Sequence, residues 1–410
     1  MKVPEAAETH SGFFQTARYR LFWISSLFSN MGTWMQQVAQ PWVLLSLNSS
    51  PFWVGLDGFA MNAPSLIFTL WGGVLADRFD KRRTVIFFQS IQFLCILAMV
   101  IFMLLGWLKV WIIVLISFLI GLTDSLSMPS FQSIIPSLVN PKDIHRAVSL
   151  NSTQFNLSRT LGPAIAGIVI VRFGALACFG ANAASYLPFF LSLYFIYPRS
   201  KMPSKNEPVQ ARPLKQMQEF LNMLRNPEVR LPLLTLFVTN LFCGPLITFC
   251  AVLVKNVFQA EVGSFGGAMA AFGTGGLIGA ASSFISFPKS VRRNVLSSEI
   301  AIFLGLLVIA ISLNQSFPLL IVLLVMSGAA FTAGNIQINT FLQESAANHV
   351  RGRIASLYQL AISGGVSIGA LFTGFVVSQV HISRALALNG MLAVALQIWV
   401  LLRQGLQKGA

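Results

Sequence analysis

The sequence predicts an all-α membrane protein with twelve transmembrane helices in two pseudo-symmetric six-helix bundles. Three observations predict this class. First, 55% of the 410 residues are hydrophobic and only 10% are charged, whereas soluble globular chains carry about 25% charged residues. Second, apolar runs of the roughly 20 residues that span a bilayer recur along the whole chain. Third, lysine and arginine gather in every second gap between these runs.

The apolar runs define the twelve expected spans. We expect the first run not to be a cleavable signal peptide, because it is longer than a signal h-region and follows a polar, basic segment. The runs lie at residues 21–47, 52–75, 84–107, 110–138, 146–171, 174–197, 231–254, 265–287, 294–313, 317–344, 353–379 and 382–403.

The net charge of +15 follows membrane topology. A soluble chain this basic would suggest a nucleic-acid partner. With the N-terminus placed in the cytoplasm, however, 23 of the 28 lysines and arginines fall in inner segments. One more, Arg159, lies within a span, and the outer loops keep Lys109, Arg172, Lys255 and Arg384. This asymmetry predicts that both termini are cytoplasmic, and we expect no nucleic-acid partner.

The four cysteines all lie in apolar runs. Their positions show neither metal-ligand spacing nor clustering in an outer loop, so we expect free buried thiols and no metal or cofactor. They are Cys95, Cys178, Cys243 and Cys250.

One long polar segment, residues 198–230, divides the chain into an N-terminal six-helix bundle (1–197) and a C-terminal one (231–410). The later part of this cytoplasmic linker has the apolar spacing of an amphipathic helix on the membrane surface, although a plain connecting helix fits it too.

The two halves also resemble each other. The motif "GFAMNAP" at 58–64 is similar to "GGAMAAF" at 266–272, and "RAVSLN" at 146–151 is similar to "RIASLY" at 353–358. "GPAIAG" and "GALFTG" match at nearly the same offset. Parallel repeats of this kind place a transport site between the halves near the bilayer midplane.

Polar stripes run along several spans. Asn30, Thr33, Gln37 and Gln40 fall within one arc of a helix. Amides facing lipid are costly, so the stripe faces either protein or a wet cavity. Hydrogen bonding between helices is the alternative to a cavity. A cavity of amides and aromatic rings suits an amphipathic organic molecule. The candidate lining residues are Asn30, Thr33, Trp34, Gln37, Gln40, Phe131, Asn151, Phe155, Asn240, Asn335, Asn339 and Tyr358.

The loop "GGVLADRFDKRRTV" at 72–85 is a candidate gating motif. Asp77 stands among basic residues just after a span, where it could cap a neighbouring helix or bind an arginine in one conformation only. A solvated basic loop that only sets topology is the alternative. The candidate gating residues are Gly73, Asp77, Arg78, Lys81 and Arg82, with Arg351 and Arg353 as possible partners.

These residues resemble the loop 2–3 signature of the major facilitator superfamily, with Asp80 in place of the usual glycine. "NMGTWMQQVAQPW", "MPSFQSIIPSLV", "AVSLNSTQFNLSRTLGPAIAG" and "RGRIASLYQL" are similar to the branch of that superfamily that includes the enterobactin exporter and related drug exporters. In the second half, Phe287 stands where Asp77 would be, which puts a second latch in doubt. "GPAIAG" is similar to the antiporter motif, although Ser158 replaces its first glycine.

Ionisable groups within the spans are candidates for proton coupling. Asp124 and Arg159 lie at similar distances from the turn between spans 4 and 5. We therefore expect them at one depth, either as a switchable proton site or as a permanent ion pair that fixes the hairpin. Asp57, nearer the outer surface, is the third candidate.

The resemblance implies a proton-coupled exporter of a siderophore or similar amphipathic drug, working by alternating access in the bacterial inner membrane. A flippase or importer of lipids or lysophospholipids with the same fold is the alternative. Neither a Walker loop, a GxSxG elbow nor an HExxH pair occurs, so we expect no enzyme. The expected partners are the small molecule, protons and lipid, and we expect a monomer.

Overall fold

The computed structural model describes residues 17–48, 50–140, 143–195, 223–282, 293–345 and 351–406. The described secondary structure is helical throughout. Its helices are α1 (Ala17–Leu47), α2 (Phe52–Arg78), α3 (Lys81–Leu104), α4 (Val110–Ile134), the 3-10 helix η2 (Ile135–Leu138), α5 (Ile144–Phe173), α6 (Ala175–Phe195), α8 (Pro227–Phe242), α9 (Pro245–Thr248), α10 (Cys250–Asn256), α11 (Val262–Ser282), α12 (Arg293–Leu313), α13 (Phe317–Ser345), α14 (Arg351–Gln379) and α15 (Ile382–Leu406).

The all-α membrane class is confirmed. Each of the twelve expected spans coincides with one or more described helices. Eight helical segments in the described part are long and apolar enough to cross a membrane. The linker expected at 198–230 lies mostly outside the described residues, and so does its amphipathic helix. All four cysteines are free thiols.

Local sequence explains where several helices begin and end. Asp80 caps α3, since its carboxylate accepts a hydrogen bond of 2.8 Å from the backbone N–H of Arg83. Gly174 ends α5 with a φ of 79°, a left-handed conformation that favours glycine. The span expected to be continuous over 231–254 is interrupted between α8 and α9. Pro245 lacks a backbone N–H and follows Gly244, which explains the break.

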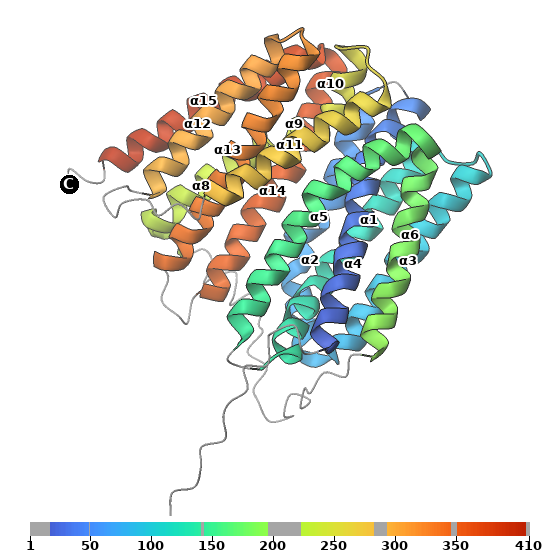
Figure 1. Cartoon of the computed structure of the whole chain (residues 1–410). Coiled ribbons are helices and arrows are strands. Elements are labelled where there is room, and N and C mark those ends of the chain that lie inside the picture. Colours follow the sequence, from blue (N-terminus) through green and yellow to red (C-terminus); the bar gives the residue numbers. More distant parts are fainter. Residues whose placement is uncertain are drawn as a thin grey trace, which may run out of the picture.

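The helices form two groups that lie side by side, α1–α6 and α8–α15 (Figure 1). In the first group α2 packs on α4, and α1 packs on α5 and α6. In the second group α11 packs on α13, and α12 packs on α13 and α15. The groups meet chiefly where α2 packs on α14 and where α5 packs on α11. These two crossings determine how the N-terminal and C-terminal groups are positioned against each other.

The two crossings are related by the internal repeat. Gly167 of α5 packs directly on Gly266 of α11, so a Cβ at Gly167 would lie 2.7 Å from the Gly266 Cα. A Cβ at Gly374 of α14 would lie 2.9 Å from the Cα of Gly55, and Gly58 lies next to Ala370. Gly58 and Gly266 are 208 positions apart, and Gly167 and Gly374 are 207 apart. Both separations match the offset of the internal repeat, so small residues at equivalent positions build both crossings. The expected pseudo-symmetry is therefore visible in the backbone contacts.

The halves are joined most closely at the end where α1 finishes and α2 begins. The Lys255 ammonium donates a 2.9 Å hydrogen bond to the carbonyl of Leu45. The Trp42 ring stacks on Phe265 with centroids 6.0 Å apart. We call this end, defined by Trp42, Leu45, Lys255 and Phe265, the closed end. The ribbons of the two groups separate toward the opposite end, where α1 begins (Figure 1).

Candidate transport site between the two halves

Arg159 lies midway along α5, within the expected bilayer depth. Its guanidinium carbon is 5.6 Å from the centroid of Trp34 on α1 and 5.7 Å from the centroid of Phe331 on α13. Both distances are within the range of cation–π attraction. Arg159 also interacts electrostatically with Tyr358 on α14. One cation thus joins aromatic side chains from both halves of the chain.

Two further contacts complete this group of residues. Phe155, one turn before Arg159, meets the Trp34 ring edge to face at 6.0 Å and keeps 41% of its surface exposed. The Tyr358 hydroxyl donates a 3.1 Å hydrogen bond to the carbonyl of Asn335 on α13. We call Trp34, Phe155, Arg159, Phe331 and Tyr358 the central site. Flat apolar walls around one cation can hold an amphipathic organic ligand.

The polar stripe of α1 divides between two environments. Asn30 donates to Gln154 of α5 at 3.3 Å, and Thr33 bonds the carbonyl one turn earlier in its own helix. Gln37 is half-buried, and no hydrogen bond joins its side chain to a described residue. Gln40, by contrast, is buried inside the N-terminal group and is not available to a cavity in this conformation. The stripe is therefore divided between half-buried positions and the interior of the N-terminal group.

Gln40 belongs to a buried chain of hydrogen bonds that ends at Asp57. Its amide nitrogen donates to the Asp57 carboxylate at 2.7 Å and to Ser117 of α4 at 2.8 Å. The Ser117 hydroxyl donates to the other Asp57 oxygen at 2.6 Å. Behind Gln40, Gln36 donates to the Gln40 carbonyl oxygen at 3.1 Å, and Asn182 of α6 donates to Gln36 at 2.6 Å. We call these five residues the amide relay.

Every donor in the amide relay points toward Asp57. The Asp57 carboxylate is buried, and among the described residues no lysine, arginine or histidine forms an ion pair with it. A buried carboxylate without a cation is costly when charged. Asp57 is therefore suited to binding a proton, and flipping the amides of Gln40, Gln36 and Asn182 would let the relay accommodate the protonated form.

Asp124 and Arg159 form no ion pair in this structure. Gln92 of α3 and Tyr186 of α6 lie beside the carboxylate of Asp124. Arg159 instead faces α1, α13 and α14. Similar depth along two helices does not fix the direction in which a side chain points. The proposed switch between them does not operate through a direct contact in this conformation.

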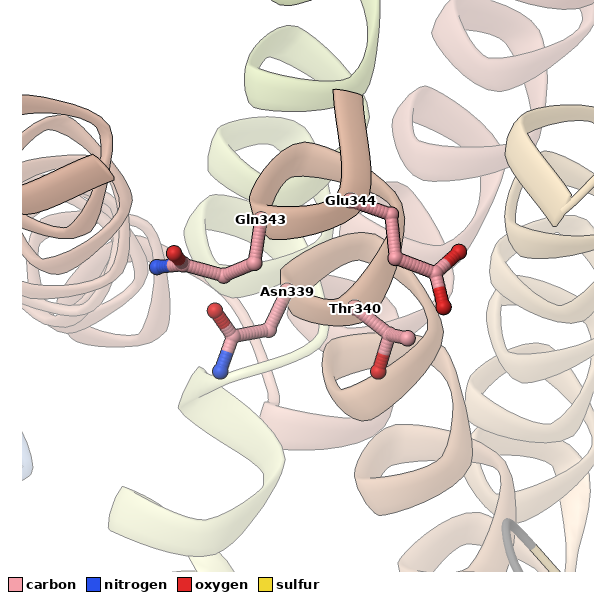
Figure 2. Close-up of a pocket in the computed structure, with 4 residues that line it drawn as sticks. All are labelled: Asn339, Thr340, Gln343 and Glu344. Atoms are coloured by element: carbon pink, nitrogen blue, oxygen red, sulfur yellow. The ribbon is translucent and has the colours of Figure 1, made fainter. Parts of the chain in front are cut away.

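The remaining cavity candidates have mixed surroundings. Asn240 is fully buried and bonds its own helix at 2.8 Å. Phe131 packs against Phe22 and Phe189 inside the N-terminal group. Asn151 is half-buried. Asn339 is exposed and points to the same side of α13 as Gln343, in an open pocket that Thr340 and Glu344 also line (Figure 2).

The loop between α2 and α3 is only partly described. The side chains of Asp77, Arg351 and Arg353 lie outside the described part, so the expected latch cannot be placed. Gly73 has open space around it, Arg78 is exposed and Lys81 is half-buried. Arg82 donates a 2.7 Å hydrogen bond to the carbonyl of Tyr194, at the end of α6. Arg82 therefore ties the loop to its own half.

Sequence reasoning missed Gln36, Ser117, Asn182 and Phe331. Gln36 stands next to Gln37 in "MQQ", and a buried amide in a span needs a partner, so that signal was present. Asn182 and Ser117 are single polar residues within apolar spans, which is a weaker indication of a buried partner. Phe331 had none, because phenylalanine occurs 35 times in the chain.

Comparison with known proteins agrees with this architecture. The staphyloferrin A transporter of Staphylococcus aureus is 22% identical over 92% of this chain and 94% of its own length. The multidrug efflux pump Tap of Mycolicibacterium fortuitum is 23% identical over 86% of this chain and 88% of its own length. Among solved structures, the nucleoside transporter NupG superposes with a TM-score of 0.76 at 12% identity, covering 94% of this chain and 98% of that one. At 12% identity the superposition supports a shared fold and nothing about the substrate.

The family model and the relatives, together with the helical architecture, identify a transporter of the major facilitator class and not an enzyme. Residues 9–409 match the family described as transmembrane secretion effector, and the chain belongs to that family.

Proposed function

We propose that this protein is a proton-coupled exporter that moves a siderophore or similar amphipathic molecule out of the cytoplasm by alternating access. The central site is the observation that carries the proposal. It combines aromatic side chains from both halves with one cation, Arg159. It also lies between the halves, where transporters with two such repeats bind their substrates. Similarity to a staphyloferrin A transporter and to multidrug efflux pumps supports a small organic substrate.

The closed end fits one step of the proposed transport cycle. Contacts between the halves gather at the end opposite the start of α1. With the cytoplasmic N-terminus that the charge distribution predicts, this conformation would receive its substrate from the cytoplasm. Proton coupling would then supply the energy for release outside, and we assign Asp57 as the first protonation site because it is buried without a cation.

Transport into proteoliposomes tests the proposal. Vesicles with an acidic lumen should accumulate staphyloferrin A or an amphipathic dye from a neutral medium, because protons leaving through the protein drive the substrate inward. A protonophore should abolish the accumulation, and protein-free vesicles give the background. Movement of a fluorescent lysophospholipid without any gradient, with no gradient-driven uptake of the other compounds, would favour the flippase alternative and overturn the proposal.

A further inference from the structure

The guanidinium of Arg159 has two aromatic neighbours and, among the residues that the structure describes, no acidic partner. The described carboxylates lie elsewhere: Asp57 bonds Gln40 and Ser117, Asp124 lies beside Gln92 and Tyr186, and the others stand at or near helix ends. Within the part of the chain that the structure describes, no hydrogen bond or ion pair joins the guanidinium to a side chain or a carbonyl.

This isolation has a physical consequence. A charge at this depth is costly unless something pairs with it. Attraction to two rings offsets part of that cost. Attraction to a ring does not replace the hydrogen-bond acceptors that the five N–H groups of the guanidinium need. The planar fork of an arginine matches the two oxygens of a carboxylate.

We propose that Arg159 is an anion-recognition residue of the central site and that the substrate is an amphipathic organic anion, with a carboxylate or phenolate group next to an aromatic or apolar body. The anionic group would bind the guanidinium edge, and the apolar body would lie against Trp34 and Phe155. The hydroxyl of Tyr358 would stand beside the anion. This inference rests on the proposed transport function and specifies its substrate class.

Three fluorescent probes with one body test the inference. Dansylglycine is anionic, dansylglycinamide is neutral and of nearly the same size, and dansyl-ethylenediamine is cationic. Equilibrium binding to the purified full chain is followed by the change in dansyl emission. A charge-assisted hydrogen bond is worth about 1.5–3 kcal/mol, so the anion should bind at least about tenfold more tightly than the neutral probe. The cation should bind weakest.

Variants then locate the preference. Arg159→Gln should bind anion and neutral probe with equal affinity, whereas Arg159→Lys should keep part of the preference because it keeps the charge. Arg403→Gln is the matched control, since Arg403 stacks on Trp399 at 5.5 Å but lies on α15, away from the site. It should bind like the unmodified protein.

Equal binding of anion and neutral probe by the unmodified protein would overturn the inference, even if the Arg159 variants fail to fold. A preference that survives Arg159→Gln would overturn it as well. Gradient-driven uptake is a separate measurement. Uptake without anion preference would overturn this inference and leave the proposed function standing. Anion preference without uptake would overturn the proposed function and leave anion recognition by Arg159 standing.

Discussion

At the scale of single residues, Asp57 carries the account of proton coupling. Its carboxylate accepts hydrogen bonds from Gln40 and Ser117 and is linked through Gln36 to α6. Protonation would reverse the polarity of these amides and so alter contacts between α1, α2, α4 and α6. A change of charge at Asp57 could therefore reach the central site through α1, which carries Gln36 and Gln40 of the relay and Trp34 of the central site.

Asp57→Asn should abolish gradient-driven uptake while equilibrium binding of the probe remains, because asparagine keeps the size of the side chain but cannot exchange a proton. The comparison variant is Asp124→Asn, which should retain gradient-driven uptake, since Asp124 lies beside Gln92 and Tyr186 and outside the relay. Both are measured in acid-loaded vesicles after gel filtration has verified folding. Full uptake by Asp57→Asn together with loss in Asp124→Asn would move the proton site to Asp124.

The residues also show what a sequence can predict about a site. The helical period of α1 placed Asn30, Gln37 and Gln40 on one face, and the cost of isolated amides in lipid predicted that this face is covered. The period could not say which helix covers each turn. Gln40 meets Asp57 and Ser117 because α2 and α4 approach there, and this approach depends on contacts far apart in the chain.

At the scale of helices, the glycine crossings hold the closed end together. Gly266 of α11 lies against Gly167 of α5 so closely that a methyl group cannot be added without moving the backbone. The two helices can approach to this distance only because both positions lack a Cβ. Gly266 lies in the repeat motif "GGAMAAF" and Gly167 in the repeat motif "GPAIAG", but nothing in either motif indicated that the two glycines form the crossing between halves.

Gly266→Ala should force α5 and α11 apart and open the closed end. A cysteine at Ser264 would then react faster with a membrane-impermeant maleimide than it does in the parent protein. Gly267→Ala is the control, because nothing lies within 4 Å of a Cβ at that neighbouring position. It should leave the labelling rate unchanged. Equal rates in all three proteins would show that the crossing does not control access.

At the scale of the whole molecule, topology rests on the distribution of lysine and arginine. Twelve spans and a repeat could be predicted because bilayer thickness and hydropathy are properties of each run alone. The break between α8 and α9 was not predicted, although Gly244 and Pro245 mark it, because the hydropathy of 231–254 is unbroken.

Cysteines at Arg225 and at Asn48, both exposed, test the topology in intact cells. Arg225 belongs to the segment before α8 and should label only after the membrane is made permeable, whereas Asn48 follows α1 and should label directly. A background without the four native cysteines removes other thiols. Labelling of Arg225→Cys from outside would invert the orientation and, with it, the proposed direction of transport.

Alternating access about the central site is the central claim, and paired distances between spin labels test it most directly. One pair, Ser46 with Glu261, reports on the closed end; the other, Gln132 with Ser345, reports on the opposite end, and all four residues are exposed. Changing pH and adding dansylglycine should produce a second population in which the first distance lengthens as the second shortens. Distances that stay fixed, or that change in the same sense at both ends, would contradict the account.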